Sequence, residues 1–274
     1  MEEIRVETTN ELIQKLNSFE NQFVFRGQAN AVWGLQSSLE RVVGEKWSPE
    51  QATKFEEFSL EQFRSKFHLY DKENTQPTSK LAWLSIMQHY GVPTRLLDFS
   101  ESPYVALYFA LEGYSHQSQN DLAIYALDYT NIMDRSIVHI KDRDSGFKED
   151  RRSVYEKADV IFDTTVDRFA YPIAWIAEPK QLNARLDRQA GSFLICGDRG
   201  ARIEDVLATQ AYDGVTMQKI CFPGKLYGSC FAVLRKMNLT SKSLYGVDIV
   251  NYDVRLRDNY DGRSTGVIVA VNWL

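Results

Sequence analysis

The chain has 274 residues, 44% of them hydrophobic and 25% charged, with a formal net charge of −5. This composition is typical of a globular protein, and the negative charge argues against a broadly basic surface for nucleic acid while leaving room for a local basic groove. Three cysteines without CxxC spacing and four scattered histidines argue against a disulfide framework and a metal motif. The acidic start lacks an apolar stretch, so we expect a cytoplasmic protein with no signal peptide and no membrane partner.

The first third of the chain predicts two helices and a strand between them. A first helix is expected from Thr9 or Asn10 onward, because either residue can cap an amphipathic segment. The stretch NQFVFRGQ (21–28) predicts a short strand that breaks at its glycine. A long helix is expected over 48–70, since it starts with Ser-Pro and its phenylalanines recur near helical spacing.

The middle of the chain alternates helices and short strands. A second helix is expected over 79–90, where Gly91 and the following proline end it. Residues 94–99 predict a short buried strand, and Ser102-Pro103 opens a third apolar helix. The β-branched and aromatic content of 121–128 predicts another strand.

The later part contains one charge-dense segment and several apolar ones. Residues 141–157 (KDRDSGFKEDRRSVYEK) predict an exposed, mobile insertion, either a loop or a solvated helix. Further strands are expected in YPIAWIA, GSFLICG, VTMQKICF and TGVIVAVNWL, and helices in KQLNARLDRQ, 202–212 and 224–237. The irregular interleaving of helices and short strands predicts a single α+β domain over 1–274, with a mixed or antiparallel sheet.

No P-loop, GxGxxG, GxSxG or kinase motif is present, so the candidate residues are polar side chains in apolar surroundings. Arg26 ends an aromatic strand and is followed by glycine. Its guanidinium suits a phosphate or a carboxylate in a cleft. The alternative is a structural pair with a carboxylate at the edge of the core, such as Asp98.

The segment TRLLDFS (94–100) admits two interpretations. On a strand, Arg95 and Asp98 would face opposite sides, whereas in a kinked turn they would be neighbours. A buried Arg95–Asp98 pair that fixes the segment to the core is the structural alternative. The other is a ligand site, where Ser100 and Ser102 would line the N-terminus of the next helix.

A third group of polar residues lies in NARLDRQAGSF (183–193). Arg185 and Gln189 are one helical turn apart, and Gly191 then leads into a strand. The Gln189 amide can contact a ribose hydroxyl or another neutral polar group. Equally open is a capping glutamine beside a solvated arginine.

Together, FRGQ (25–28), WLSIMQHYGVPTRLLDFSESPYVALYFA (83–110) and NARLDRQAGSF resemble the FRG domain family, named for its Phe/Tyr-Arg-Gly motif. LRKMNLTSKSLYGVDIV (234–250) resembles the C-terminal helix and loop of that family, so the resemblance covers most of the chain. It implies a bacterial or phage protein, with a defence or toxin role by analogy.

A more distant resemblance is to ADP-ribosyltransferases, in the order Arg26, then the strand 94–102 leading into YVALYFA, then Gln189. It implies that Arg26 holds the NAD diphosphate or ribose, that the Thr/Ser strand braces the nicotinamide side, and that Gln189 contacts a ribose hydroxyl. A glutamine stands where transferases carry a glutamate, so Asp98 or Glu178 would supply the carboxylate.

These resemblances imply a nucleotide-directed, NAD-consuming enzyme that uses no metal, with a nucleotide ligand and a protein or nucleic-acid acceptor as partners. The expected catalytic residues are Arg26, Asp98 and Gln189. The expected nucleotide-binding residues are Arg26, Gln28, Thr94, Arg95, Ser100, Arg185 and Gln189. Two alternatives are a non-catalytic nucleotide- or nucleic-acid-binding module and a protein-interaction domain with a structural Arg–Asp pair.

Overall fold

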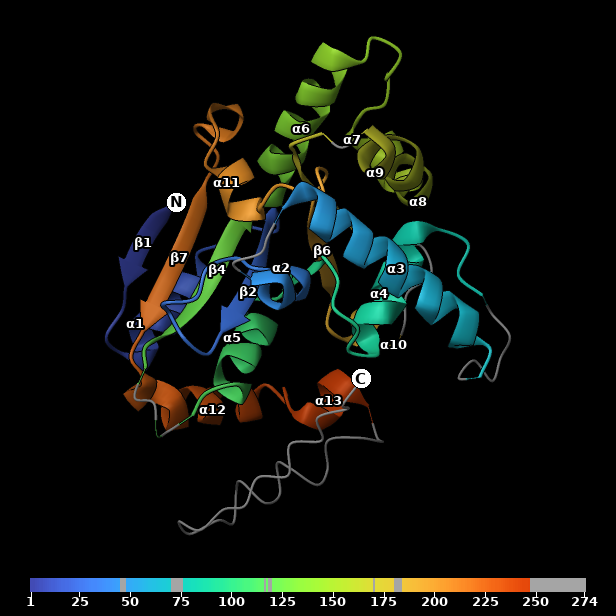
Figure 1. The fold of residues 1–274 in the computed structure, drawn as a ribbon. Helices are drawn as coiled ribbons and strands as arrows, with labels where there is room; N and C mark the ends of the chain where they lie inside the picture. Colours follow the sequence, from blue (N-terminus) through green and yellow to red (C-terminus); the bar gives the residue numbers. More distant parts are fainter. Residues whose placement is uncertain are drawn as a thin grey trace.

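The fold is known from a computed structural model, which describes residues 1–44, 48–69, 76–115, 117, 120–169, 171–179 and 184–246 (Figure 1). Within these ranges the side chains of positions 169, 184 and 185 are not described. The strand predicted in TGVIVAVNWL lies outside the described residues.

A mixed seven-stranded sheet forms the centre of the described chain, in the order β1-β7-β4-β2-β3-β6-β5. The strands are β1 (Glu2–Arg5), β2 (Phe23–Gln28), β3 (Leu97–Ser100), β4 (Leu122–Asp128), β5 (Ala174–Ala177), β6 (Gly191–Cys196) and β7 (Met217–Phe222). All neighbouring strands are antiparallel except β1 and β7, which run parallel. The predicted α+β class with a mixed sheet is confirmed.

The sheet opens in its middle, between β2 and β3. These strands are paired only at Phe25 and Ser100, whereas β2 and β4 are paired along the whole of Phe23–Gln28. Beyond the Phe25–Ser100 pair, Arg26 and Asp98 lie on diverging strands. The opening leaves backbone and side chains there without the ladder partners that a continuous sheet would supply.

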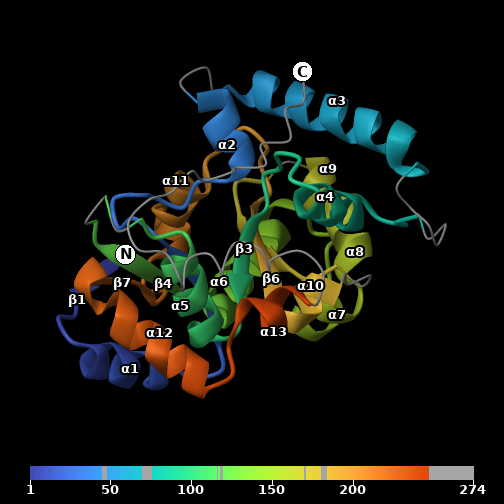
Figure 2. The same cartoon turned by 90° about the horizontal axis from the view of Figure 1, so that it is seen from below.

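Helices cover both faces of the sheet, and each face has its own apolar core. One face is covered by α1 (Thr9–Asn17), α5 (Pro103–Glu112), α12 (Tyr227–Lys236) and α13 (Ser241–Tyr245). The other is covered by α3 (Pro49–Phe67), α4 (Lys80–His89), α6 (Tyr129–Arg143), α7 (Arg151–Glu156), α8 (Ala158–Ile161), the π-helix η2 (Phe162–Val166) and α11 (Ile203–Leu207). Figure 2 shows α1 and α12 together on one side and α3 on the opposite side.

The remaining elements are short. They are α2 (Ser38–Val43), α9 (Asp167–Phe169), α10 (Ala184–Arg188), η3 (Gln210–Tyr212) and η4 (Gly224–Leu226). All three cysteines are free and buried. In the described ranges, no helix is both long enough and apolar enough to cross a bilayer.

Helix α5 packs against β2 at Gly27, the glycine of the FRGQ motif. A Cβ atom on Gly27 would lie 1.8 Å from the carbonyl oxygen of Ala106 and 2.7 Å from the amide nitrogen of Ala110. The small side chains of Ala106 and Ala110 leave the helix backbone free to approach the strand this closely. The motif glycine therefore sets the distance between β2 and the helix that follows β3.

Local signals predicted several helix ends correctly. Ser48 caps α3 with Pro49 in its first turn, Ser102 caps α5 with Pro103 in its first turn, and Gly91 has a φ of +79° just after α4. Such ends depend on neighbouring residues alone, through side-chain oxygens that bind free amides and through a glycine that tolerates positive φ.

Other local predictions were wrong. The cap of α1 is Thr8, β2 continues through Gly27, and Phe58 is 63% exposed instead of lying on the buried face of α3. That face is chosen by the facing core, and it buries Leu60 and the carboxylate of Glu56.

The charge-dense segment 141–157 includes the end of α6 and the helix α7. Most of its side chains are exposed, but Phe147 and Val154 are buried in the core. These two apolar anchors attach the segment to the rest of the fold. Its mobility stays a prediction.

Candidate functional site

Three adjoining cavities lie where the sheet opens, with volumes of about 250, 190 and 80 Å³. Asp98 lines all three, Arg26 lines the two larger ones, and Gln189 lines the largest and the smallest. We call them together the split cleft. Among the elements that border it, β3, α5, α10 and α13 lie together at the centre of Figure 2. Together the cavities reach the size typical of small-molecule sites, roughly 300–1,000 Å³.

Arg26 spans the opening of the sheet from β2. Its Nη1 atom donates a hydrogen bond of 2.7 Å to the main-chain oxygen of Asp98. Its Nε atom is buried and has no hydrogen-bond partner among the described residues. Burial lowers the pKa of this guanidinium, the nearby Asp98 charge opposes that shift, and the Arg41 charge adds to it. An arginine with an unused donor and a cationic neighbour favours an anionic ligand.

Arg41 is the second arginine of the split cleft, and sequence reasoning missed it. It lies on α2, and with Arg26 it lines the 190 Å³ cavity. Its Nη1 atom donates a hydrogen bond of 2.8 Å to the main-chain oxygen of Gln36. In sequence it resembles a solvated helix residue, and only the placement of α2 beside the sheet opening brings it to the cleft.

Ser100 and Gln189 form the floor of the largest cavity. The Ser100 hydroxyl donates a hydrogen bond of 2.7 Å to the main-chain oxygen of Gln189 and accepts one of 3.0 Å from the amide of Ser102. The amide Nε2 of Gln189 donates to the main-chain oxygen of Leu244, at 3.4 Å. The next residue, Ala190, has a φ of +43°, a conformation that costs a non-glycine residue free energy. The strained residue thus lies between Gln189, which lines the cleft, and the start of β6.

Glu112 places a carboxylate in the same cavity, and sequence reasoning missed it. It is the last residue of α5, and it accepts hydrogen bonds from the hydroxyls of Tyr108 (3.2 Å) and Tyr245 (2.6 Å). Burial, with the charge of Glu112, raises the pKa of Tyr108, so the hydroxyl keeps its proton as a donor. The spacing of Tyr108 and Glu112, one helical turn apart, was the available signal.

Some predicted site residues lie outside the split cleft. Thr94 is fully buried, where its hydroxyl donates to Oε1 of Gln88 and accepts from the amide of Leu96. The amide of Gln28 donates to the main-chain oxygen of Gly34, at 2.9 Å. Both residues brace loops next to the cleft and do not line it. Arg185 lies in α10, but its side chain is outside the described part of the structure.

Arg95 also lies outside the split cleft, and the predicted Arg95–Asp98 pair is wrong. The structure begins β3 at Leu97, so Arg95 lies in the turn before the strand. From there its Nε atom lies 3.0 Å from Oε2 of Glu56, and its Nη2 atom forms an ion pair with Asp167. Those carboxylates are buried, whereas the side chain of Asp98 is exposed. Burial makes the distant acids the stronger partners.

The partners of Arg95 belong to a larger charged cluster, which comprises Glu56, Lys80, Arg95, Asp167 and Arg199. Lys80 lies within 3.2 Å of Glu56 and 3.0 Å of Asp167, and Arg199 within 2.8 Å of Asp167. Burial alone would raise the pKa of Asp167, but the three cations outweigh it and lower the pKa to about 2. The cluster joins α3, α4 and α9 and is structural.

The structure therefore brings together Arg26, Asp98, Ser100 and Gln189, as expected, and adds Arg41 and Glu112. Glu178 lines a different cavity with Glu101 and Ser192, so of the two expected carboxylates only Asp98 lies at the cleft.

Residues 21–119, about a third of the chain, match the family model of the FRG domain. The matched segment contains Arg26, Arg41, Asp98, Ser100 and Glu112 but ends before Gln189. No curated protein and no solved structure matches the chain. The resemblance to the FRG domain that the sequence indicated is thus confirmed over residues 21–119, and the extension of one domain over 1–274 stays a prediction.

Proposed function

We propose that the split cleft binds NAD and breaks its nicotinamide–ribose bond, passing ADP-ribose to water or to a protein or nucleic-acid acceptor. The observation that supports this proposal is that cationic and polar side chains line adjoining cavities. Arg26 and Arg41 face one cavity, while Glu112, Gln189 and Ser100 line the next. A dinucleotide needs both kinds: cationic donors for its diphosphate and polar groups for its ribose.

The diphosphate is assigned to Arg26 and Arg41. The two guanidinium charges oppose each other, which lowers the pKa of Arg26 in addition to burial. A bound anion relieves this repulsion and supplies an acceptor for the buried Nε atom of Arg26. Binding therefore gains free energy from two guanidinium groups that form no ion pair with the described residues.

The reacting ribose is assigned to the largest cavity. When the bond between C1′ and the nicotinamide nitrogen breaks, its electron pair leaves with nicotinamide and positive charge develops on C1′ and the ring oxygen. The Glu112 carboxylate, fixed by two tyrosine hydroxyls, stabilises that charge, and Gln189 contacts a ribose hydroxyl. Water or the acceptor then attacks C1′, and the exposed carboxylate of Asp98 takes its proton. No metal enters these steps.

A second candidate function is a non-catalytic nucleotide-binding module. A glutamine occupies the position where the resemblance to transferases implies a glutamate, and this favours binding without turnover. In that function Arg26 and Arg41 grip phosphates as above, and Glu112 only holds its two tyrosines. A defence or toxin role in a bacterial or phage setting belongs to the catalytic proposal alone, because it requires consumption of NAD or modification of an acceptor.

The test measures binding and turnover separately. ADP-ribose binding is followed by calorimetry, and nicotinamide release from NAD is followed with and without protein or nucleic-acid acceptors. We expect Glu112→Gln to keep ADP-ribose binding within a few-fold and to lower the turnover rate about 100-fold or more, the range found when a transition-state contact is removed. The matched control is Glu61→Gln, an exposed glutamate on α3.

Each outcome decides between the functions. Binding with no turnover in any condition overturns the catalytic proposal and supports the binding module. Absence of ADP-ribose binding by the unsubstituted chain overturns both. An equal loss of turnover in Glu61→Gln and Glu112→Gln removes Glu112 from the reaction.

A further inference from the structure

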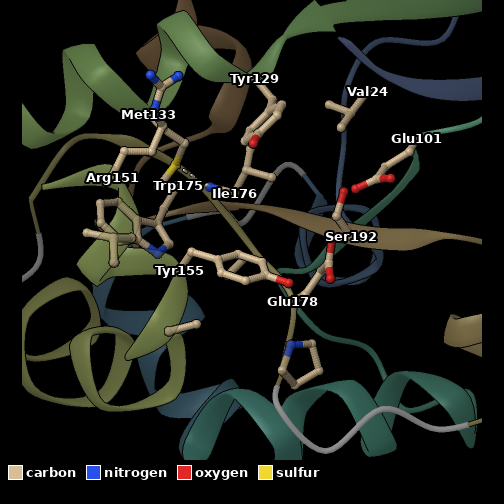
Figure 3. A pocket seen from close by; sticks show the side chains of 14 residues that line it. Val24, Glu101, Tyr129, Met133, Arg151, Tyr155, Trp175, Ile176, Glu178 and Ser192 are labelled. Carbon is tan, nitrogen blue, oxygen red and sulfur yellow. Dashed lines mark hydrogen bonds between the residues drawn. The ribbon is translucent and has the colours of Figure 1, made fainter. Parts of the chain in front are cut away.

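Another cavity, of about 180 Å³, lies across the sheet from the largest cavity of the split cleft (Figure 3). Neighbouring residues of three strand segments face the two sites. Phe25, Ser100 and Gly191 line the split cleft, whereas the adjacent Val24, Glu101 and Ser192 line this cavity. The alternation of side chains along a strand produces this arrangement. The cavity is therefore separate from the proposed NAD site, although the same strands build both.

One half of the cavity is apolar and aromatic. Trp175 and Met133 are buried in its wall, Tyr129 lies next to them, and Val24 lies across from them near Glu101 (Figure 3). The Met133 sulfur accepts a hydrogen bond of 3.1 Å from the amide of Ile176, which fixes its position. Aromatic faces and a polarizable sulfur are suited to a flat apolar group, and aromatic faces also attract cations.

The other half of the cavity is polar and acidic. The Ser192 side chain is 2% exposed, and its hydroxyl has no hydrogen-bond partner within the described ranges. Glu101 and Glu178 bring carboxylates to the same side, and the Tyr155 hydroxyl points toward them (Figure 3). A buried hydroxyl without a partner costs free energy, and a ligand that donates a hydrogen bond to it removes that cost.

Among the described residues that line the cavity, the cation is Arg151, which lies on the side of Met133 (Figure 3). Its Nε atom lies 3.6 Å from Oδ1 of Asp134, and both side chains are about half exposed. The guanidinium therefore lies at the surface beside a carboxylate of its own. Among the described residues that line the cavity there are thus two carboxylates, and the one cation has an ion-pair partner of its own.

We propose that this cavity binds a small organic cation, a primary amine carried on an aromatic body. The aromatic body packs between Trp175, Tyr129 and Met133, while the ammonium donates to Ser192 and to the carboxylates of Glu101 and Glu178. The size fits such a molecule, because an apolar cavity of about 150 Å³ holds benzene. This proposal does not depend on the reaction assigned to the split cleft.

The probes are three molecules with a phenyl ring on a two-carbon chain and different end groups, each measured by calorimetry against the full chain. Phenethylamine is the cation, 2-phenylethanol the neutral analogue and 3-phenylpropionate the anion. We expect phenethylamine to bind about tenfold or more tightly than 2-phenylethanol, since hydrogen bonds between charged groups are the strong ones. Equal affinity of the cation and the alcohol, or tighter binding of the anion, overturns the proposal.

Substitutions that we expect to change the affinity for phenethylamine in opposite directions complete the test. Glu101→Gln and Ser192→Ala each weaken phenethylamine binding about tenfold and leave 2-phenylethanol binding within a few-fold. Arg151→Gln tightens phenethylamine binding several-fold, because it removes a positive charge from the cavity wall. A gain in affinity cannot come from a damaged fold.

Glu61→Gln, on the exposed side of α3, is the control and leaves all three affinities unchanged. Weaker amine binding in Arg151→Gln overturns the assignment of an ammonium to this cavity. ADP-ribose binding measured on the same variants reports on the split cleft separately, so failure of one proposal is distinguishable from failure of the other.

Discussion

Two arginines lie at the segment 95–98 in different surroundings: Arg95, which is buried and belongs to the segment, and Arg26, which is partly buried and donates a hydrogen bond to the main-chain oxygen of Asp98. Arg95 is surrounded by carboxylates, with Glu56 and Asp167 as ion-pair partners. Arg26 donates to one main-chain oxygen and keeps a buried Nε atom without a partner in the described structure. One guanidinium has buried ion-pair partners, whereas the other has no ion pair among the described residues and only the more distant charge of Asp98.

This difference teaches how structural and functional charges are told apart. A buried charge with its countercharges in place holds segments together, and its removal leaves those countercharges exposed to a low dielectric. A charge left without countercharges lowers stability until a ligand supplies them. We therefore interpret Arg95 as part of the structure and Arg26 as part of the site.

The largest expected effect is the loss of stability caused by Arg95→Met. The substitution leaves Glu56, which is 1% exposed, with fewer cations, and it should lower the free energy of unfolding by about 3–5 kcal/mol. Urea denaturation followed by circular dichroism measures this change. Arg152→Met, at a side chain that is 87% exposed, is the control and should change stability by less than about 0.5 kcal/mol. A loss under about 1 kcal/mol for Arg95→Met would contradict the structural interpretation.

The next largest expected effect is that of Gly27→Ala, which tests the close packing of α5 against β2. Gly27→Ala places a methyl group against the backbone of α5, where the closest atom is 1.8 Å away. The helix must shift, at a cost of about 3 kcal/mol, the upper end for an overpacked core. Because α5 carries Glu112, ADP-ribose binding should fall as well. Gly228→Ala, in α12 with open space around its Cβ position, serves as the comparison and should be neutral or slightly stabilising. Full stability in Gly27→Ala would contradict the close approach.

The pH dependence of stability tests the charged cluster in another way. The pKa of Asp167 is lowered to about 2 in the folded protein, below its ordinary value of 3.8. Its stabilisation is therefore present above about pH 4 and is lost as the pH falls toward 2, a loss of about 2 kcal/mol. Unfolding free energies measured from pH 5 to pH 2 should decrease less steeply in Asp167→Asn than in the unsubstituted chain. Identical slopes would show that the carboxyl is not held by the cations.

Local chemistry made part of the fold predictable from the sequence. The ends of α3, α4 and α5 depend on caps and prolines within a few residues, so Ser48, Gly91 and Ser102 indicated them. The motif FRGQ indicated Arg26 as a site residue, because a lone arginine on an apolar strand needs an explanation. Such inferences need no knowledge of distant segments.

Contacts between distant segments could not be predicted in this way. Arg95 pairs with acids on α3 and α9, and a sequence offers no means of ranking those acids against the nearer Asp98. Arg41 lies on a short polar helix whose pattern does not indicate a site, and for Glu112 the sequence signal is limited to its spacing from Tyr108, one helical turn away. Both reach the cleft only because β2 and β3 separate after one residue pair.

The smallest expected change in stability is that of Arg26→Met, and it tests directly whether Arg26 and Arg95 have different roles. Arg26→Met should change the free energy of unfolding by less than about 1 kcal/mol, because it removes a buried guanidinium whose Nε atom is unsatisfied along with one hydrogen bond to Asp98. The same substitution should lower ADP-ribose affinity about 100-fold, as expected for the loss of a charged pair with phosphate. Arg95→Met, measured in mild conditions where it is still folded, is the matched control and should keep that affinity within a few-fold. The comparison fails if Arg26→Met loses as much stability as Arg95→Met and binds ADP-ribose as well as the unsubstituted chain. The two arginines then have the same structural role, and Arg41 is the remaining arginine of the split cleft that could bind the phosphates.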